Sequence, residues 1–165
     1  MPASKHRKNR RAHQPRVARL PSCYRFSNKA EVDLQLIPHV ELSKILDGTA
    51  TENAWFTLGF RVNVGQLAAA LYFAENRELR EAMDAAVEAI AAVGKRYRAR
   101  GRLGVTGDEY RVIGRALNLT DEIQRMCTRR ELLEVSLAVE DQQNHGDNAP
   151  RWRAVHARIE GARDE

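Results

Sequence analysis

The chain has little cysteine, few aromatic residues and no long apolar run, and each shortage excludes a class of protein. Its 165 residues include two cysteines, Cys23 and Cys127, which are too few and too far apart for a disulfide framework or a zinc site. We interpret both as reduced thiols. The most apolar segment, 54–73, is interrupted by polar residues, so no stretch reaches the roughly 18–20 apolar residues that span a bilayer. We therefore expect no membrane partner. The charged start has no apolar segment after it, so we expect no signal peptide.

Recognisable catalytic and metal-binding motifs are also missing. There is no glycine-rich phosphate loop, no GxSxG, no HExxH and no Cys/His pair at ligand spacing. The histidines are scattered: His6 and His13 lie near the start, and His39, His145 and His156 are isolated. We therefore predict a protein without enzyme activity, cofactor or metal. The alternative is an enzyme whose site folding assembles from residues far apart in the chain.

The most informative shortage is that of acidic residues at the start of the chain, where the first is Glu31. Residues 1–21 contain seven cations: Lys5, Arg7, Lys8, Arg10, Arg11, Arg16 and Arg19. These account for the net charge of +5, because the other 20 Lys and Arg face 22 Asp and Glu. High net charge with almost no large apolar side chains is typical of disorder. We predict a disordered basic arm that binds nucleic acid or another polyanion by neutralising phosphates.

The rest of the chain has the pattern of a helical domain. Alanine, the strongest helix former, recurs through its middle, and apolar residues repeat at the three-and-four spacing of an amphipathic helix. We predict a mostly α fold, a small helical bundle whose main helices cover 50–74, 76–100 and 106–141. The expected organisation is a disordered basic arm over 1–21, a helical domain over 22–141, and a polar loop with a C-terminal amphipathic helix, opening at Pro150, over 142–165.

Capping signals indicate where the helices begin and end. Thr49 and Thr106 each precede a glutamate at the spacing of a capping box. Thr120, followed by two acidic residues, predicts a further helix start after a turn near residue 118. Gly101 is expected to close the helix over 76–100. Gly65 lies in an apolar seam, where we expect it to allow a close helix crossing.

Two short segments alternate polar and apolar residues, which is the pattern of a β-strand. For residues 31–37 we predict a strand, which Pro38 either ends or follows with the first turn of a helix over 38–47 that Gly48 closes. Residues 133–140 alternate in the same way, but the helical stretch before them favours a helix. A two-stranded ribbon of these two segments is the structural alternative.

A second basic cluster lies at the end of the helix over 76–100. Its members are Lys95, Arg96, Arg98, Arg100 and Arg102. They surround Tyr97, and interleaved cations and aromatic rings are typical of single-stranded nucleic-acid binding. The competing interpretation is that cations near a helix C-terminus complement the helix dipole, and the sequence favours it. The phosphate-binding interpretation gains support if the cluster lies on the same side as the arm.

Residues 113–130 have the outline of a helix-turn-helix. A recognition helix in the major groove needs polar residues at its start that bind bases. Here the second helix would begin with Asp121 and Glu122, which phosphates repel. We therefore favour a simple corner between two bundle helices over a recognition helix.

Several stretches resemble small proteins encoded by phages and prophages of Gram-negative bacteria. They are the basic opening, Thr106-Gly107-Asp108-Glu109, Ala116-Leu117-Asn118-Leu119-Thr120-Asp121 and Thr128-Arg129-Arg130-Glu131. We know of no established activity for that group. The resemblance therefore implies a genomic setting and assigns no site residue. The location that we expect, the cytoplasm of a bacterial cell, follows from the interpretation of both cysteines as reduced thiols.

Together these observations predict a non-enzymatic accessory protein that associates with nucleic acid through its basic arm. The alternative is a protein-binding module, such as an inhibitor of a host or defence complex, in which the arm competes for a polyanion site. A host protein and a second copy of the chain are the candidate protein partners.

Overall fold

The computed structural model describes residues 28–161, which are helical apart from short connections. The elements are α1 (Asn28–Asp47), α2 (Glu52–Tyr72), α3 (Arg77–Arg100), α4 (Gly107–Met126), α5 (Arg129–His145), a 3-10 turn (Gly146–Asn148) and α6 (Pro150–Gly161). No strand occurs within the described residues, and the predicted mostly α bundle is confirmed. The predicted arm over 1–21 lies outside them.

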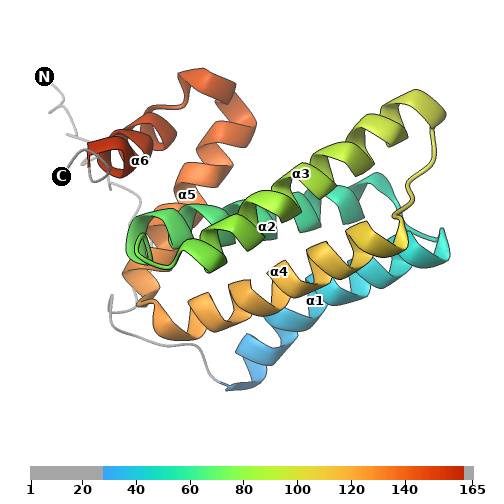
Figure 1. Cartoon of the computed structure of the whole chain (residues 1–165), viewed down its shortest axis with the longest axis horizontal. Helices are drawn as coiled ribbons and strands as arrows, with labels where there is room; N and C mark the ends of the chain where they lie inside the picture. The colour runs from blue at the N-terminus through green and yellow to red at the C-terminus, as the bar shows by residue number, and fades with distance from the viewer. Residues whose placement is uncertain (1–27, 162–165) are drawn as a thin grey trace, which may run out of the picture.

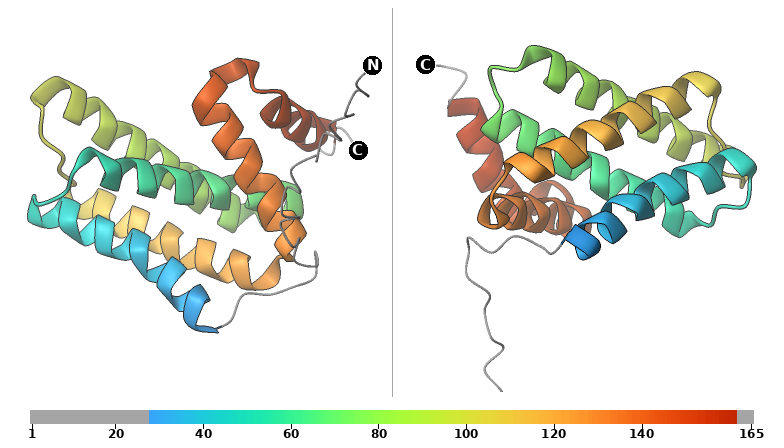
Figure 2. Two further views of the ribbon diagram at one scale, coloured as in Figure 1. Left: turned by 180° about the vertical axis from the view of Figure 1, so that it is seen from behind. Right: turned by 90° about the horizontal axis from the view of Figure 1, so that it is seen from below.

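Helices α1 to α4 lie alongside one another, and α5 and α6 cover one end of this group (Figure 1). Helix α2 is central, because it contacts α1, α3, α4, α5 and α6. Helices α1 and α3 lie on opposite sides of the α2–α4 pair (Figure 2). This position explains why α2 has apolar residues on more than one face: Val62, Ala68 and Ala69 are fully buried.

The strand predicted for residues 31–37 is wrong, because α1 runs through them and through Pro38. The buried side of α1 consists of Gln35, Pro38, Leu42 and Ile45, at the three-and-four spacing of a helix. Gln35 is the polar member of this buried stripe, whereas Val32 and Leu36, which the alternation assigned to the apolar face of a strand, are half-exposed. Gly48, with φ of 72°, follows the last residue of α1 as predicted.

Helix α4 also differs from the prediction, because residues 116–121 do not turn. Thr120 is buried in the middle of the helix, and its hydroxyl donates to the carbonyl oxygen of Ala116 at 2.8 Å. A threonine that bonds back within its own helix does not cap a new one. The helix start predicted at Thr120 is therefore wrong, and Thr128 caps α5 instead. Residues 113–130 form the corner between α4 and α5.

Three other predicted helix boundaries are confirmed. Thr106 opens α4 with a complete capping box, Gly101 closes α3 in a left-handed conformation, and Pro150 opens α6. Residues 133–140 are helical in α5, which excludes the two-stranded ribbon.

Two further predicted boundaries are wrong. The capping box at Thr49 does not form, because the backbone N–H of Thr49 donates to the carbonyl of Lys44 at the end of α1. Thr51 precedes α2 instead, and its side chain makes no cap bond. The polar loop expected from residue 142 is shorter than predicted, because α5 continues to His145.

Glycine allows α2 to pack closely against both of its long neighbours. A Cβ atom on Gly65 would lie 2.2 Å from Thr120 Oγ1 and 3.2 Å from Met83 Sδ, so the predicted close crossing is confirmed. A Cβ on Gly94 of α3 would lie 2.6 Å from the ring of Trp55. The Trp55 indole in turn donates to the carbonyl of Ile90 at 3.0 Å. Side chains larger than glycine would therefore push α2 away from α3 and α4.

We expect Gly65→Ala to lower the free energy of unfolding by about 1–3 kcal/mol, because the added methyl overpacks the crossing. Gly59→Ala is the matched control on the same helix, because its Cβ would meet Ile90 at an ordinary 3.8 Å. It should be neutral or stabilising by up to about 1 kcal/mol through helix propensity. Urea unfolding of both variants measures the difference, and equal stability would contradict the close crossing.

Candidate nucleic-acid interface

The second basic cluster lies where three helices end or begin. Helix α3 stops at Gly101, whose N–H donates to the carbonyl of Tyr97 at 2.7 Å. Residues 101–106 then connect α3 to α4. The C-terminal end of α1 lies beside this connection (Figure 1), and Gly48 lines one pocket together with residues 102–106. Cations near the end of α3 are therefore brought next to the start of α4 and the end of α1.

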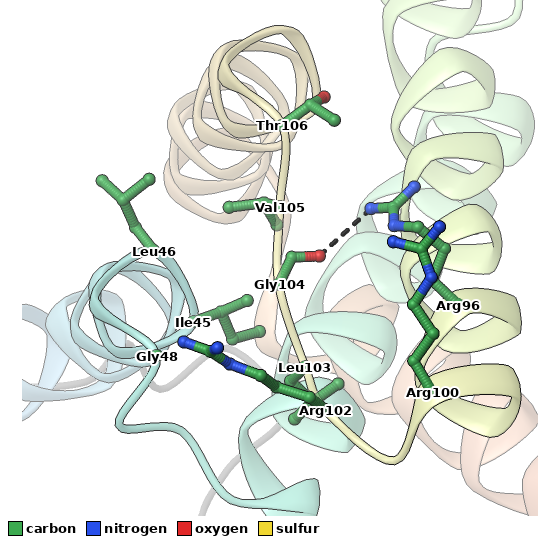
Figure 3. A pocket seen from close by; sticks show the side chains of 10 residues that line it. All are labelled: Ile45, Leu46, Gly48, Arg96, Arg100, Arg102, Leu103, Gly104, Val105 and Thr106. Carbon is green, nitrogen blue, oxygen red and sulfur yellow. Dashed lines mark hydrogen bonds between the residues drawn. The ribbon is translucent and has the colours of Figure 1, made fainter.

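A pocket of about 540 Å³ opens between these segments. Its lining residues are Ile45, Leu46, Gly48, Arg96, Arg100, Arg102, Leu103, Gly104, Val105 and Thr106. Figure 3 shows Arg96 and Arg100 projecting from α3 on one side and Arg102 reaching across toward Gly48 on the other. The pocket thus combines apolar side chains with guanidinium groups.

Arg96 is occupied by an internal ion pair. It donates from Nη1 to Glu109 Oε1 at 2.6 Å and from Nη2 to Oε2 at 2.5 Å. A further bond from Nη2 reaches the carbonyl of Gly104 at 3.1 Å. Hydrogen bonding to Glu109 raises the pKa of Arg96, and the same bonds lower the pKa of Glu109. Arg96 therefore holds in place the connection between α3 and α4, and the carboxylate of Glu109 balances its charge.

Arg100 and Arg102 are exposed cations that line the pocket. Within the described residues neither has a carboxylate at ion-pair distance. The Arg102 guanidinium lies over Gly48, with Nη2 2.9 Å from the position that a Cβ there would take. These two side chains are the members of the cluster that remain available to a ligand in the pocket.

The other members of the predicted cluster point elsewhere. At 100° per residue, Arg98 lies on the far side of α3 from Arg96 and Arg100. Lys95 and Arg98 are exposed, and neither lines the pocket. Tyr97 is half-buried against the core, so it does not offer a free ring for base stacking. The structure therefore divides the cluster into an occupied arginine, two pocket arginines and two outward cations.

The described part of the chain begins one helix length away from this pocket. The seven arm cations Lys5, Arg7, Lys8, Arg10, Arg11, Arg16 and Arg19 lie outside the described residues. The chain enters at Asn28, the end of α1 opposite Gly48. Helix α1 has 20 residues, which separates these two points by about 30 Å at helical rise.

The sequence prediction missed a partly buried polar group between three helices. Arg61 of α2 donates to Asp121 Oδ1 at 2.6 Å and to Gln124 Oε1 at 2.5 Å, both on α4. His39 of α1 places Nε2 at 3.3 Å from Asp121 Oδ2. Arg61 was visible only as an interruption of an apolar segment. Its partners lie 60 or more positions away, and no local spacing signals such a pair.

Arg61 also lines a second pocket, of about 390 Å³, whose walls include Ile37, Phe60 and Leu132.

Among residues 28–161, no three or more His, Cys, Asp or Glu side chains lie close enough together to bind a metal ion. Likewise, no helix in the described range combines the length and apolar character that crossing a membrane requires. Protein-family models, curated proteins and solved structures provide no match to this chain.

We expect Glu109→Gln to lower the free energy of unfolding by about 1–2 kcal/mol at pH 7, through the weakened capping box and ion pair. Because the pKa of Glu109 is lowered in the folded state, its contribution is complete above the unfolded pKa of about 4.3. It is lost as the pH falls through the folded pKa.

The difference in unfolding free energy between the wild type and Glu109→Gln should therefore shrink as the pH is lowered from about 5 toward 3. Urea titrations across this range measure it. Glu140→Gln, which changes an exposed carboxylate on α5, is the control and should differ little from the wild type. A difference that does not vary with pH would contradict the ionic role of Glu109.

Proposed function

We propose that the protein is a non-enzymatic accessory protein that binds the phosphate backbone of nucleic acid, through its basic arm and through the pocket at the end of α3. The observation that supports this most is the position of Arg100 and Arg102. Both line one pocket, and among the described residues neither faces a carboxylate at ion-pair distance.

Guanidinium chemistry suits this role. A planar guanidinium matches a phosphate with two parallel hydrogen bonds. The acidic residues in the first turn of α4 do not compete, because Glu109 is paired with Arg96 and Asp108 with Arg111. Such contacts supply affinity and position without reading sequence.

The competing interpretation, that these arginines only complement helix dipoles, makes a different prediction. Under it, neutralising Arg100 and Arg102 destabilises the fold by a few tenths of a kcal/mol or more and changes no binding. Under our proposal, the same substitutions weaken phosphate binding while the fold is retained.

The test compares a double variant with a control of the same charge. Arg100→Gln/Arg102→Gln should weaken retardation of a DNA or RNA probe in a gel. It should also reduce the slope of log affinity against log salt by about two, roughly 0.9 per phosphate contact on a duplex. Arg115→Gln/Arg130→Gln removes two exposed arginines outside the pocket and should leave the slope unchanged. Deletion of residues 1–21 should reduce the slope further.

Two outcomes would overturn the proposal: no retardation by the full chain, or equal effects of the two double variants. A pull-down from host lysate with and without nuclease then distinguishes the alternative. A partner that survives nuclease treatment supports a protein-binding module, such as an inhibitor of a host or defence complex.

The setting that we propose is the cytoplasm of a bacterial cell carrying a phage or prophage. Its support is the resemblance of the basic opening and of three short stretches to small phage and prophage proteins. The sequence of the genes on either side of this one tests the setting directly.

A further inference from the structure

The second pocket, which Arg61 lines, is largely apolar and is formed by several helices. Its apolar walls come from α1, α2 and α5, and they include Ile37, Phe60, Val64, Leu132 and Leu133. Two of these side chains, Ile37 and Leu133, are 50% and 54% exposed. The pocket volume of about 390 Å³ lies in the range of small-molecule sites, about 300–1,000 Å³. The pocket therefore has the size and the apolar walls that suit a small ligand.

Arg61 gives this pocket a hydrogen-bond donor. Its Nη2 donates to Asp121 and Gln124, and these bonds hold the guanidinium in place. Within residues 28–161, neither Nε nor Nη1 of Arg61 has a hydrogen-bond acceptor. Nε is buried, whereas Nη1 is not, so Nη1 is the donor that Arg61 can offer to a ligand. A guanidinium that other bonds already orient loses little conformational entropy when a ligand binds.

The charges that line the pocket favour an anion. Arg61 and Arg129 line it, and among the described residues no Asp or Glu does. Asp121, which pairs with Arg61, is not one of the lining residues. A carboxylate in the pocket would accept a charge-assisted hydrogen bond from a guanidinium, whereas the arginines would repel a cation. The pocket therefore suits a molecule that is apolar along most of its length and carries a negative charge.

The volume limits the length of such a molecule. About 390 Å³ corresponds to about 13 water molecules at about 30 Å³ each, and a methylene group is similar in size to a water molecule. An eight-carbon carboxylate such as octanoate therefore fits the pocket.

We propose that this pocket binds a small carboxylate with an unbranched apolar chain, similar in length to octanoate. The chain lies between α1, α2 and α5, against Phe60 and Leu132, and the carboxylate accepts a hydrogen bond from Nη1 of Arg61. A free carboxylate is favoured over a second copy of this chain. The acidic side chains of a protein have only one or two methylene groups, so none could fill the apolar part of the pocket and also bind Arg61.

This proposal does not depend on the proposed binding of nucleic acid. The two pockets have no lining residue in common, so either ligand could bind without the other.

Isothermal titration calorimetry of the full chain with three ligands tests the two parts of the site. Octanoate should bind about tenfold more tightly than 1-octanol, which has a chain of the same length without the charge. It should bind about 15-fold more tightly than hexanoate, because each of the two additional methylene groups contributes about a fourfold gain in affinity when buried. No binding of octanoate, or equal affinities for octanoate and 1-octanol, would overturn the proposal.

A blocking variant tests whether octanoate binds in this pocket. Ser136 lines it from α5, so Ser136→Phe should place a ring in the cavity and weaken octanoate binding by about tenfold or more. Gln143→Phe adds the same ring at an exposed position of α5 that does not line the pocket, and it should bind octanoate as the wild type does. Urea unfolding checks that both variants are folded. Equal affinities of the two folded variants would overturn the assignment.

A substitution at an exposed position tests the charge without disturbing the core. Leu133→Glu adds a carboxylate to the pocket, whereas Leu133→Gln adds a neutral side chain of the same size. Because like charges repel, octanoate should bind Leu133→Glu about fivefold more weakly than Leu133→Gln, while 1-octanol should bind both equally. The same affinity of octanoate for both variants would contradict an anionic ligand.

Two further outcomes would identify a different occupant and overturn the proposal. An affinity for octanoate that falls as the protein concentration rises would indicate that a second copy of the chain covers the pocket. Binding that appears only after residues 1–21 are deleted would indicate that the preceding chain covers it. Gel retardation of a nucleic-acid probe by Ser136→Phe should match that of the wild type, because the pocket that contains Arg100 and Arg102 is unchanged.

Discussion

The close approach of α2 to α4 at Gly65 is the constraint on which the rest of the structure depends. Since α2 contacts every other α-helix of the described chain, its distance from α4 sets where α1 and α3 can pack on either side. Thr120 fills the space that a side chain on residue 65 would take, and its hydroxyl is satisfied by Ala116. A polar residue is thus buried in the core at no cost in unmet hydrogen bonds.

The ionic group of Arg61, Asp121 and His39 lies next to this crossing and restricts how far the helices can shift along their axes. Asp121 is 9% exposed and accepts from Arg61 of α2, with His39 of α1 close by. Apolar contacts tolerate small slides between helices, whereas a buried carboxylate requires its partners at hydrogen-bond distance. The group therefore fixes how α1, α2 and α4 are aligned along their axes.

The parts of the fold that local chemistry determines could be predicted from the sequence. The amphipathic stripe of α3, the capping box at Thr106 and the glycine after Asp47 depend only on neighbours in the chain. The strand at 31–37 and the turn near Thr120 were wrong because Gln35 and Thr120 are polar residues that tertiary contacts bury. In the candidate site, the cluster of cations was visible, but the pairing of Arg96 with Glu109 depends on how the connection folds.

The pairing of Arg96 with Glu109 affects how the pocket would bind an anion. Glu109 caps the first turn of α4 and simultaneously holds Arg96, which in turn holds the carbonyl of Gly104. Through these bonds the Glu109 carboxylate holds in place the connection between α3 and α4, which includes Arg102. A connection that is already ordered loses little conformational entropy when a ligand binds. The electrostatic attraction between its arginines and an anion would therefore contribute more fully to affinity.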